Sequence, residues 1–439
     1  MGLREERRRR AEQKRLADPT SIDIEFVDGG DAENMYAQTV DAGHKVDERV
    51  QRIFVICIVL VVVYLIGLLA PKALIDALSV EAATNTGDLS QLFSRITPAE
   101  LVSATQGRIA TVVGEFQGTS DGHLFVRYIV IALAGAGLAL SGAVYQGSFR
   151  NALVSPSTLG VMTGGQFGMT VWVIIACATA GDNAVTLALV SAAGDGTYSV
   201  TDYIATSYGL SICSFAGCFL VVGLVLLVMA LSRGRAESGI MLIITGQVIG
   251  AVIGQFTNVV RYYYTTVDPW GDAAQLLQDL QVASFYRTFT WVDLVCIGVP
   301  LALTFVVVMR LRDKMAALAF DRSEQRTMGV DTKVVNVAVV GLCTLLTAII
   351  ISFCGTVGYV GFLVPHLARR LVGPNFKYLL PAATALGAVF VLSAYVLLEI
   401  TVGADYASLT GVFISIAGAA VFVATAIGGK GAANGSFLR

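Results

Sequence analysis

The residues best suited to chemistry lie in the stretch Gly358–Asn375, where an apolar run turns into a proline, a histidine and a pair of arginines. His366 in such a place could ligate a metal ion or relay a proton. The alternative is an interfacial histidine bonded to a backbone carbonyl or to a neighbouring helix. The other two histidines, His44 and His123, lie outside the apolar runs. No three-histidine metal cluster is available, and we favour the interfacial histidine.

Other reactive groups are sparse. Within the apolar stretches only Asp293 and Glu399 are acidic, and both lie near stretch ends, so the carboxylate relay typical of ion-coupled membrane proteins is not predicted. The seven cysteines lie in or beside apolar runs without a C-x-x-C pair, which indicates neither a disulfide framework nor a zinc site. The sequence G-G-K-G at 428–431 lacks the frame of a phosphate-binding loop. We therefore expect no catalytic residue, no bound metal and no cofactor on this chain.

Polar and small residues also punctuate the apolar stretch at 239–260. Glycines recur there at every fourth position, a doubled G-x-x-x-G pattern that lets another helix approach closely: Gly246, Gly250 and Gly254. Three amides follow a nearby stripe: Gln247, Gln255 and Asn258. The amides would either bond helices to one another or line a wet path, and the pattern suits both roles.

The composition sets the environment of all these residues. Of the 439 residues, 55% are hydrophobic and 14% are charged, against about 25% charged in soluble domains, and the mean hydropathy is +0.71. A spanning helix needs roughly 20 apolar residues. Ten stretches qualify, one of them short, which predicts an all-α membrane protein with about ten transmembrane helices: 53–75, 124–146, 157–180, 209–231, 239–260, 291–310, 334–353, 359–372, 378–398 and 409–427.

The distribution of lysine and arginine predicts the orientation. With ten spans both termini lie on one side, and a cytoplasmic N-terminus places 24 of the 30 Lys and Arg residues in inner segments, as the positive-inside rule favours. The chain is thus expected to be a multi-pass protein of the cytoplasmic membrane. Its parts are a polar cytoplasmic arm at 1–50, a transmembrane domain at 51–430 and a tail at 431–439. The arm is either a disordered tail or a docking element.

One segment predicted on the inner side, residues 311–332, has an apolar stripe that a plain connecting loop would not need. Residues 311–332 combine a short apolar stripe with charges on both sides, which predicts one or two short helices on the membrane face. The alternative is a solvated loop that only retains positive charge on the inner side. Further along, Arg369 and Arg370 fall at the predicted inner end of the eighth span, and Gly373-Pro374 is expected to end that helix.

Three blocks of this sequence resemble the signature of the FecCD-type permeases of ABC importers, the class that includes vitamin B12 and iron-siderophore permeases. They are "GAGLALSGAVYQGSFRNALVSPSTLGVMTGG" at 135–165, "LAFDRSEQRTMGV" at 318–330 and "GTVGYVGFLVPHLARRLVGPNFKYLLP" at 355–381. Departures include Ala152 in place of a proline and Asp321 in place of a glycine. The matching motif residues are Asn151, Pro156, Gly160, Gly361, Pro365, His366 and Arg369. Gln146, in the first block, is expected to line the translocation path or to pack between helices, as are the glycines and amides of 239–260.

The resemblance implies a type II ABC importer permease fold and uptake of an iron chelate (siderophore) from an extracytoplasmic binding lipoprotein. Haem or cobalamin would be an alternative substrate, and a secondary transporter is the alternative from another class. It also implies an identical or different second permease subunit in the lipid membrane and a partner ATPase dimer that carries ATP and Mg²⁺. A nucleic acid is not an expected partner. The residues expected to couple to the ATPase are Met315, Leu318, Ala319, Arg322, Glu324, Arg326 and Gly329.

Overall fold

The computed structural model describes ten segments of the chain and single positions at 106, 110 and 113. The chain divides into two units, Met1–Val50 and Gln51–Arg439. Most of the predicted arm at 1–50, and the whole tail at 431–439, lie outside the described residues. The described segments are 48–67, 124–152, 154–180, 200–231, 239–267, 272–282, 284–285, 289–317, 332–402 and 409–428.

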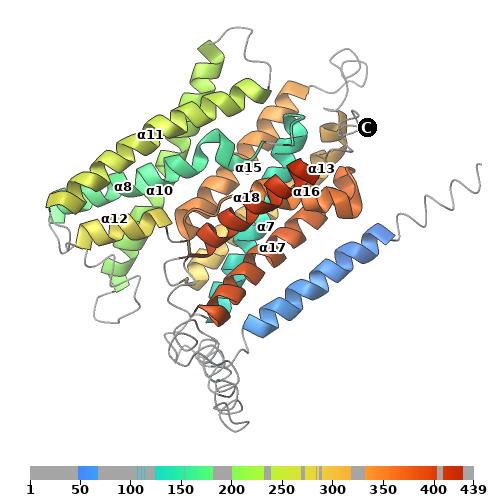
Figure 1. Cartoon of the computed structure of the whole chain (residues 1–439), viewed down its shortest axis with the longest axis horizontal. Helices are drawn as coiled ribbons and strands as arrows, with labels where there is room; N and C mark the ends of the chain where they lie inside the picture. Colours follow the sequence, from blue (N-terminus) through green and yellow to red (C-terminus); the bar gives the residue numbers. More distant parts are fainter. Residues whose placement is uncertain are drawn as a thin grey trace, which may run out of the picture. The chain divides into compact units, whose positions relative to one another are not determined.

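The described part of the second unit is almost entirely helical (Figure 1). Its extended pairing is limited to one isolated bridge between Ser284 and Gly355, so the predicted all-α fold is confirmed. A helix at Glu48–Gly67 comes first. The others are α7 (Leu124–Ser148), the 3₁₀ helix η1 (Pro156–Leu159), α8 (Val161–Ala180), α10 (Val200–Leu231), α11 (Gly239–Val267), α12 (Asp272–Val282), α13 (Trp291–Ala317), α15 (Thr332–Cys354), α16 (Val360–Val372), α17 (Phe376–Thr401) and α18 (Thr410–Gly428).

Eight of the described helices are long and apolar enough to cross a membrane. The two other predicted spans are α16 and α18. The α16 helix has 13 residues and is therefore about 20 Å long, too short to cross a hydrocarbon core of about 30 Å. The predicted eighth span is thus a partial one. It ends at Gly373, whose N–H donates to the carbonyl of Arg369 at 2.8 Å, as the sequence predicted.

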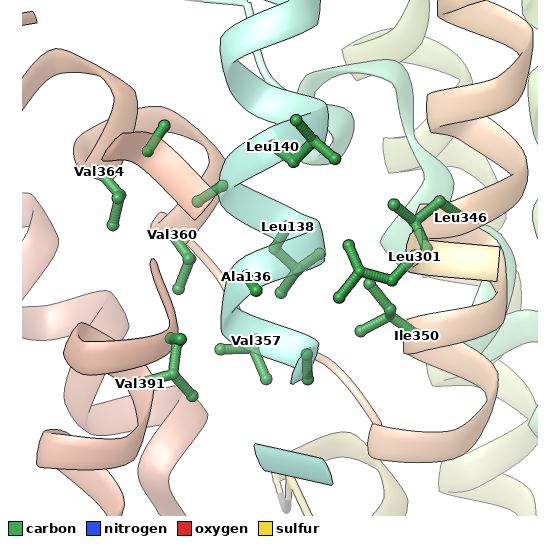
Figure 2. Close-up of a cluster of buried hydrophobic side chains, with 14 of the residues drawn as sticks. Ala136, Leu138, Leu140, Leu301, Leu346, Ile350, Val357, Val360, Val364 and Val391 are labelled. Carbon is green, nitrogen blue, oxygen red and sulfur yellow. The ribbon is translucent and has the colours of Figure 1, made fainter. Parts of the chain in front are cut away.

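Helix α7 lies at the centre of the bundle and contacts α13, α15, α16 and α17. Apart from Arg127 and Gln146 its residues are apolar or small, which is the pattern of a helix buried on most sides. In Figure 2, α7 runs between two sets of branched side chains that reach toward it from its neighbours. The labelled residues are Ala136, Leu138 and Leu140 of α7, Leu301 of α13, Leu346 and Ile350 of α15, Val357, Val360 and Val364 in or just before α16, and Val391 of α17.

A second group of helices forms around α8, which contacts α10, α11, α12 and α15. The sequence did not predict the short helix α12. Its signal was present, because Ala273, Leu276, Leu277 and Leu280 follow the helical spacing i, i+3, i+4 and i+7, and all four are buried. With only 11 residues, α12 is much shorter than the roughly 20 residues of a spanning helix, so the length of its apolar stretch did not mark it. It packs on α8 and α11.

Candidate functional site

The first and third motif blocks meet where α7 nears its end and α16 begins. A Cβ atom placed on Gly142 would overlap the carbonyl oxygen of Gly361, so the two backbones touch with no room for any side chain between them. One turn further along α7, the Nε2 atom of Gln146 donates to the carbonyl of Phe362 at 3.1 Å. Gln146 is buried, and its Oε1 atom has no hydrogen-bond partner in the described part of the chain.

The start of α16 has an unusual backbone. Tyr359 precedes the helix with φ of 61°, a left-handed conformation that is uncommon for any residue except glycine. Its carbonyl accepts the N–H groups of Phe362 at 3.0 Å and Leu363 at 2.8 Å. The cavity beside this turn measures only about 10 Å³, barely the space of one water molecule. The junction is therefore a packed joint between helices and has no room for a substrate.

Several other motif residues lie in the backbone turns next to the contact between α7 and α16. Pro156 is buried at the first position of η1, and Gly160 ends η1 with φ of 76° before α8 starts. Thr158 bonds Ser155, donating to its carbonyl at 2.7 Å and accepting its N–H at 3.1 Å, and so closes the 3₁₀ turn that precedes α8. Asn151 is half-buried in the turn after α7, where its N–H donates to the carbonyl of Gln146 at 3.2 Å.

His366 lies half-buried on α16, one residue after the buried Pro365 and three before the half-buried Arg369. Within the described ranges His366 makes no side-chain hydrogen bond, so the bond predicted for it is not found there. Among those same residues, no three His, Cys, Asp or Glu side chains lie close enough to share a metal ion. The structure therefore brings His366 to the packed face of α16 without a second group that could act with it.

The two carboxylates of the spans have structural partners. The Oδ2 atom of Asp293 accepts the backbone N–H of Thr290 at 2.8 Å and its hydroxyl at 3.1 Å, which caps the start of α13. Glu399 is 5% exposed and accepts the hydroxyl of Tyr128 at 2.6 Å. The hydrogen bonds explain why both acidic groups are tolerated inside the bundle.

The glycine ridge of α11 faces η1 and the start of α8. A Cβ atom on Gly246 would overlap the carbonyl oxygen of Thr158. At Gly250 it would lie 2.9 Å from the hydroxyl oxygen of Thr163, and at Gly254 it would lie 3.3 Å from the methyl carbon of the same threonine. The three positions are equivalent in the sequence pattern but differ in the structure, because only Gly246 meets backbone atoms that have nowhere to move.

This difference predicts an order of effects. Gly246→Ala is expected to destabilise the protein by about 1–3 kcal/mol, the usual cost of overpacking, with a smaller loss for Gly250→Ala and the smallest for Gly254→Ala. Thermal unfolding of the purified variants in detergent measures the order. Val252→Leu is the control, since Val252 is 66% exposed on the same helix. Equal stability of the Gly246 and Gly254 variants would contradict the packing described here.

The three amide side chains of α11 differ in their exposure. Gln247 and Gln255 are exposed, so within the described part of this chain they do not bond α11 to another helix. Asn258 is half-buried, donates to Oε1 of Gln255 at 3.4 Å and accepts a bond from Arg261 at 3.2 Å. Asn258 and Arg261 line a cavity of about 110 Å³ between α8, α11 and α12. Arg261 was not among the predicted site residues, because its position near the end of an apolar stretch marked it only as an outer charge.

The predicted coupling segment is described only at its start. Helix α13 continues without a break to Ala317, and Met315 is 1% exposed within the chain's own core. Met315 therefore cannot be a contact residue for a partner, and its assignment to the coupling surface was wrong. The assignment was wrong because apolar residues have the same spacing in a buried helix end and in a docking helix. The other six residues, Leu318, Ala319, Arg322, Glu324, Arg326 and Gly329, lie outside the described ranges.

Comparisons with known proteins agree on one family. Residues 88–427 match the model of the FecCD transport family. The molybdate import system permease protein MolB of Haemophilus influenzae is 28% identical over 61% of this chain and 68% of its own length. A probable iron chelatin transport system permease protein of Helicobacter pylori is 25% identical over 68% of this chain and 78% of its own.

Two further matches are a cobalamin permease and a solved structure. The cobalamin import system permease protein BtuC of Halobacterium salinarum is 25% identical over 61% of this chain and 63% of its own length. A solved structure described as an inward-facing conformation of a metal-chelate type ABC transporter superposes with a TM-score of 0.61 at 23% identity, covering 86% of this chain and 99% of the other. That likeness supports the fold.

Proposed function

This chain belongs to the FecCD transport family, and from that premise we propose that it is the permease subunit through which an ABC importer takes up an iron chelate. The match over residues 88–427 carries the proposal, since it includes α7, α8 and the helices from α10 to α17. The chelate, a siderophore, would arrive from an extracytoplasmic binding lipoprotein. The permease itself would provide the membrane path and perform no chemical reaction.

The proposed substrate rests on the relatives that share this architecture. Among them are proteins named for iron chelatin, for iron uptake and for Fe(3+)-citrate. Others are named for molybdate and cobalamin, so haem or cobalamin is the alternative within the class. A secondary transporter would need ion ligands in its spans. Asp293 and Glu399, two buried carboxylates of the described spans, are both engaged by neighbouring residues, which argues against that alternative.

The proposed partners follow from the surfaces of the helices. Helix α11 carries an exposed apolar stripe, Val248, Val252, Phe256 and Val259, which suits a second permease subunit, identical or different, or membrane lipid. On the inner side, the segment after α13 would dock on an ATPase dimer, with Leu318 and Ala319 in a groove and Arg322, Glu324 and Arg326 at its rim. ATP and Mg²⁺ would bind to the ATPase, and this chain would bind no cofactor.

Substrate competition in cells tests the proposed cargo. Cells that depend on this chain for iron should accumulate ⁵⁵Fe supplied as a ferric siderophore, and excess unlabelled chelate should suppress the uptake. Excess cobalamin, haem or molybdate should leave it unchanged. If labelled cobalamin or molybdate enters instead and ⁵⁵Fe does not, the chain carries a different cargo of the same class.

A further inference from the structure

The cavity between α8, α11 and α12 is small and polar. Its volume of about 110 Å³ is well below the ~300–1,000 Å³ of pockets that enclose drug-sized ligands. It could therefore hold one small group and exclude a whole chelate. It is lined by Gln166 and Thr170 of α8, Gly254, Thr257, Asn258 and Arg261 of α11, and Leu277 and Leu280 of α12.

The hydroxyl groups in this lining are already committed. Thr170 donates to the carbonyl of Gln166 at 2.9 Å, and Thr257 donates to the carbonyl of Ile253 at 3.1 Å. Threonines on membrane helices often bond back to their own helix in this way. Among the other lining residues, Arg261 carries the most N–H donors and the only positive charge.

Arg261 is held at the cavity by a chain of amides. Its Nη2 atom donates to Oδ1 of Asn258 at 3.2 Å, and Nδ2 of Asn258 donates to Oε1 of Gln255 at 3.4 Å. This chain fixes the amide of Asn258 with its oxygen toward the arginine. A guanidinium carries five N–H donors, and a single amide oxygen satisfies only one or two of them. The rest of the positive group is available to the cavity.

No ion pair joins Arg261 to an acidic side chain that the structure describes. Three carboxylates of the described spans have other partners: Asp313 pairs with Arg312, Asp293 caps α13 and Glu399 bonds Tyr128. The guanidinium also lies toward Asn258, one turn back along α11, which the predicted orientation places deeper in the membrane. An arginine that only snorkels would extend toward the nearer, outer surface. A positive charge kept inside a span without an acidic partner is characteristic of a functional site.

We propose that this cavity binds one anionic, oxygen-rich group of the transported substrate, with Arg261 as its charge partner. The proposal rests on the transport function proposed above and narrows its substrate to an anion. The shared chemistry is a compact group with two or more oxygens and a negative charge, which a guanidinium recognises by paired hydrogen bonds. Its source is either a free inorganic oxyanion or a carboxylate arm of a larger chelate.

Binding to the purified full-length permease tests the site without any need for transport. Molybdate and sulfate serve as inorganic probes, and citrate and ferric citrate serve as carboxylate probes, each titrated by calorimetry in lipid nanodiscs. We expect one probe class to saturate one site per chain. Arg261→Gln should weaken this binding at least tenfold, since hydrogen bonds to charged groups contribute about 1.5–3 kcal/mol, and Arg261→Lys should retain part of it.

Matched variants keep the result interpretable. Arg127→Gln removes an arginine from the outer part of α7, away from the cavity lining, and should bind the probe as the wild type does. Asn258→Leu breaks the amide chain and should weaken binding without changing the charge. Size-exclusion profiles check that each variant is folded. Wild-type binding by a folded Arg261→Gln variant, or no saturable binding of any probe to the wild type, would overturn the proposal.

The outcomes for the site and for the transport function are separable. ATP-driven uptake that survives Arg261→Gln unchanged would remove the anion site and leave the importer assignment intact. If probe binding depends on Arg261 but the protein never supports ATP-driven uptake, the anion site stands and the importer assignment is removed.

Discussion

Gly142→Ala is expected to destabilise the permease strongly, although it adds a single methyl group. The added Cβ atom would overlap the carbonyl oxygen of Gly361, so α7 and α16 would have to move apart. Because α7 is central to the bundle, that movement disturbs contacts with α13, α15 and α17 as well. Overpacking of this kind costs about 1–3 kcal/mol, and more where the backbone cannot shift.

The matched control is Gly341→Ala on α15. A Cβ atom there meets no other atom within 4 Å, so the only effect is the gain in helix propensity, about 0.5–1 kcal/mol. Thermal unfolding and the yield of monodisperse protein in detergent compare the two variants. A lower melting temperature is expected for the Gly142 variant and an equal or higher one for the Gly341 variant. Indistinguishable variants would show that α7 and α16 do not approach as closely as described.

Leu318→Asp is expected to abolish capture of the ATPase while the permease still inserts into the membrane. Helix α13 runs unbroken from Trp291 to Ala317, so the proposed docking segment begins directly at the end of a rigid transmembrane helix. A carboxylate buried there without a partner costs several kcal/mol, which corresponds to more than about 100-fold weaker binding. The measurement is the amount of ATPase recovered with the tagged permease.

Leu318→Met is the control for this experiment, because it conserves volume and apolar character and should recover the ATPase fully. Met315→Leu should also leave ATPase recovery unchanged, since Met315 packs inside the chain's own core. Full ATPase recovery and normal transport with Leu318→Asp would remove the coupling role from this segment and leave it a solvated loop.

Local patterns in the sequence predicted the helices but not their neighbours. The length and apolar content of each stretch sufficed to find the spans, because a helix in lipid must satisfy its own backbone hydrogen bonds. The glycine ridge indicated a close approach, yet the sequence held no sign that its partner is the 3₁₀ turn at Pro156–Leu159. Contacts such as Gln146 to Phe362 join residues 216 positions apart, and no local pattern reports such a pairing.

The wrong assignment of Met315 and the missed helix α12 have the same origin, because both depend on packing between distant parts of the chain. Met315 was assigned to a docking surface because its spacing fits an amphipathic helix, and only the packed structure shows that the helix end is buried. Arg261 was not singled out, because its position near the end of an apolar stretch gave no sign of a cavity. Its proposed role depends on the cavity that α8, α11 and α12 form, and α12 was missed because 11 residues are too few for a spanning helix.

The most direct test of the account is uptake by proteoliposomes that contain the purified permease, its ATPase and the binding protein. We predict that labelled ferric siderophore accumulates only when ATP is present on the ATPase side. A non-hydrolysable ATP analogue, or a proton or sodium gradient without ATP, should support no accumulation. Accumulation driven by an ion gradient through the permease alone, with no ATPase bound, would contradict the assignment of this chain as the membrane subunit of an ATP-driven importer.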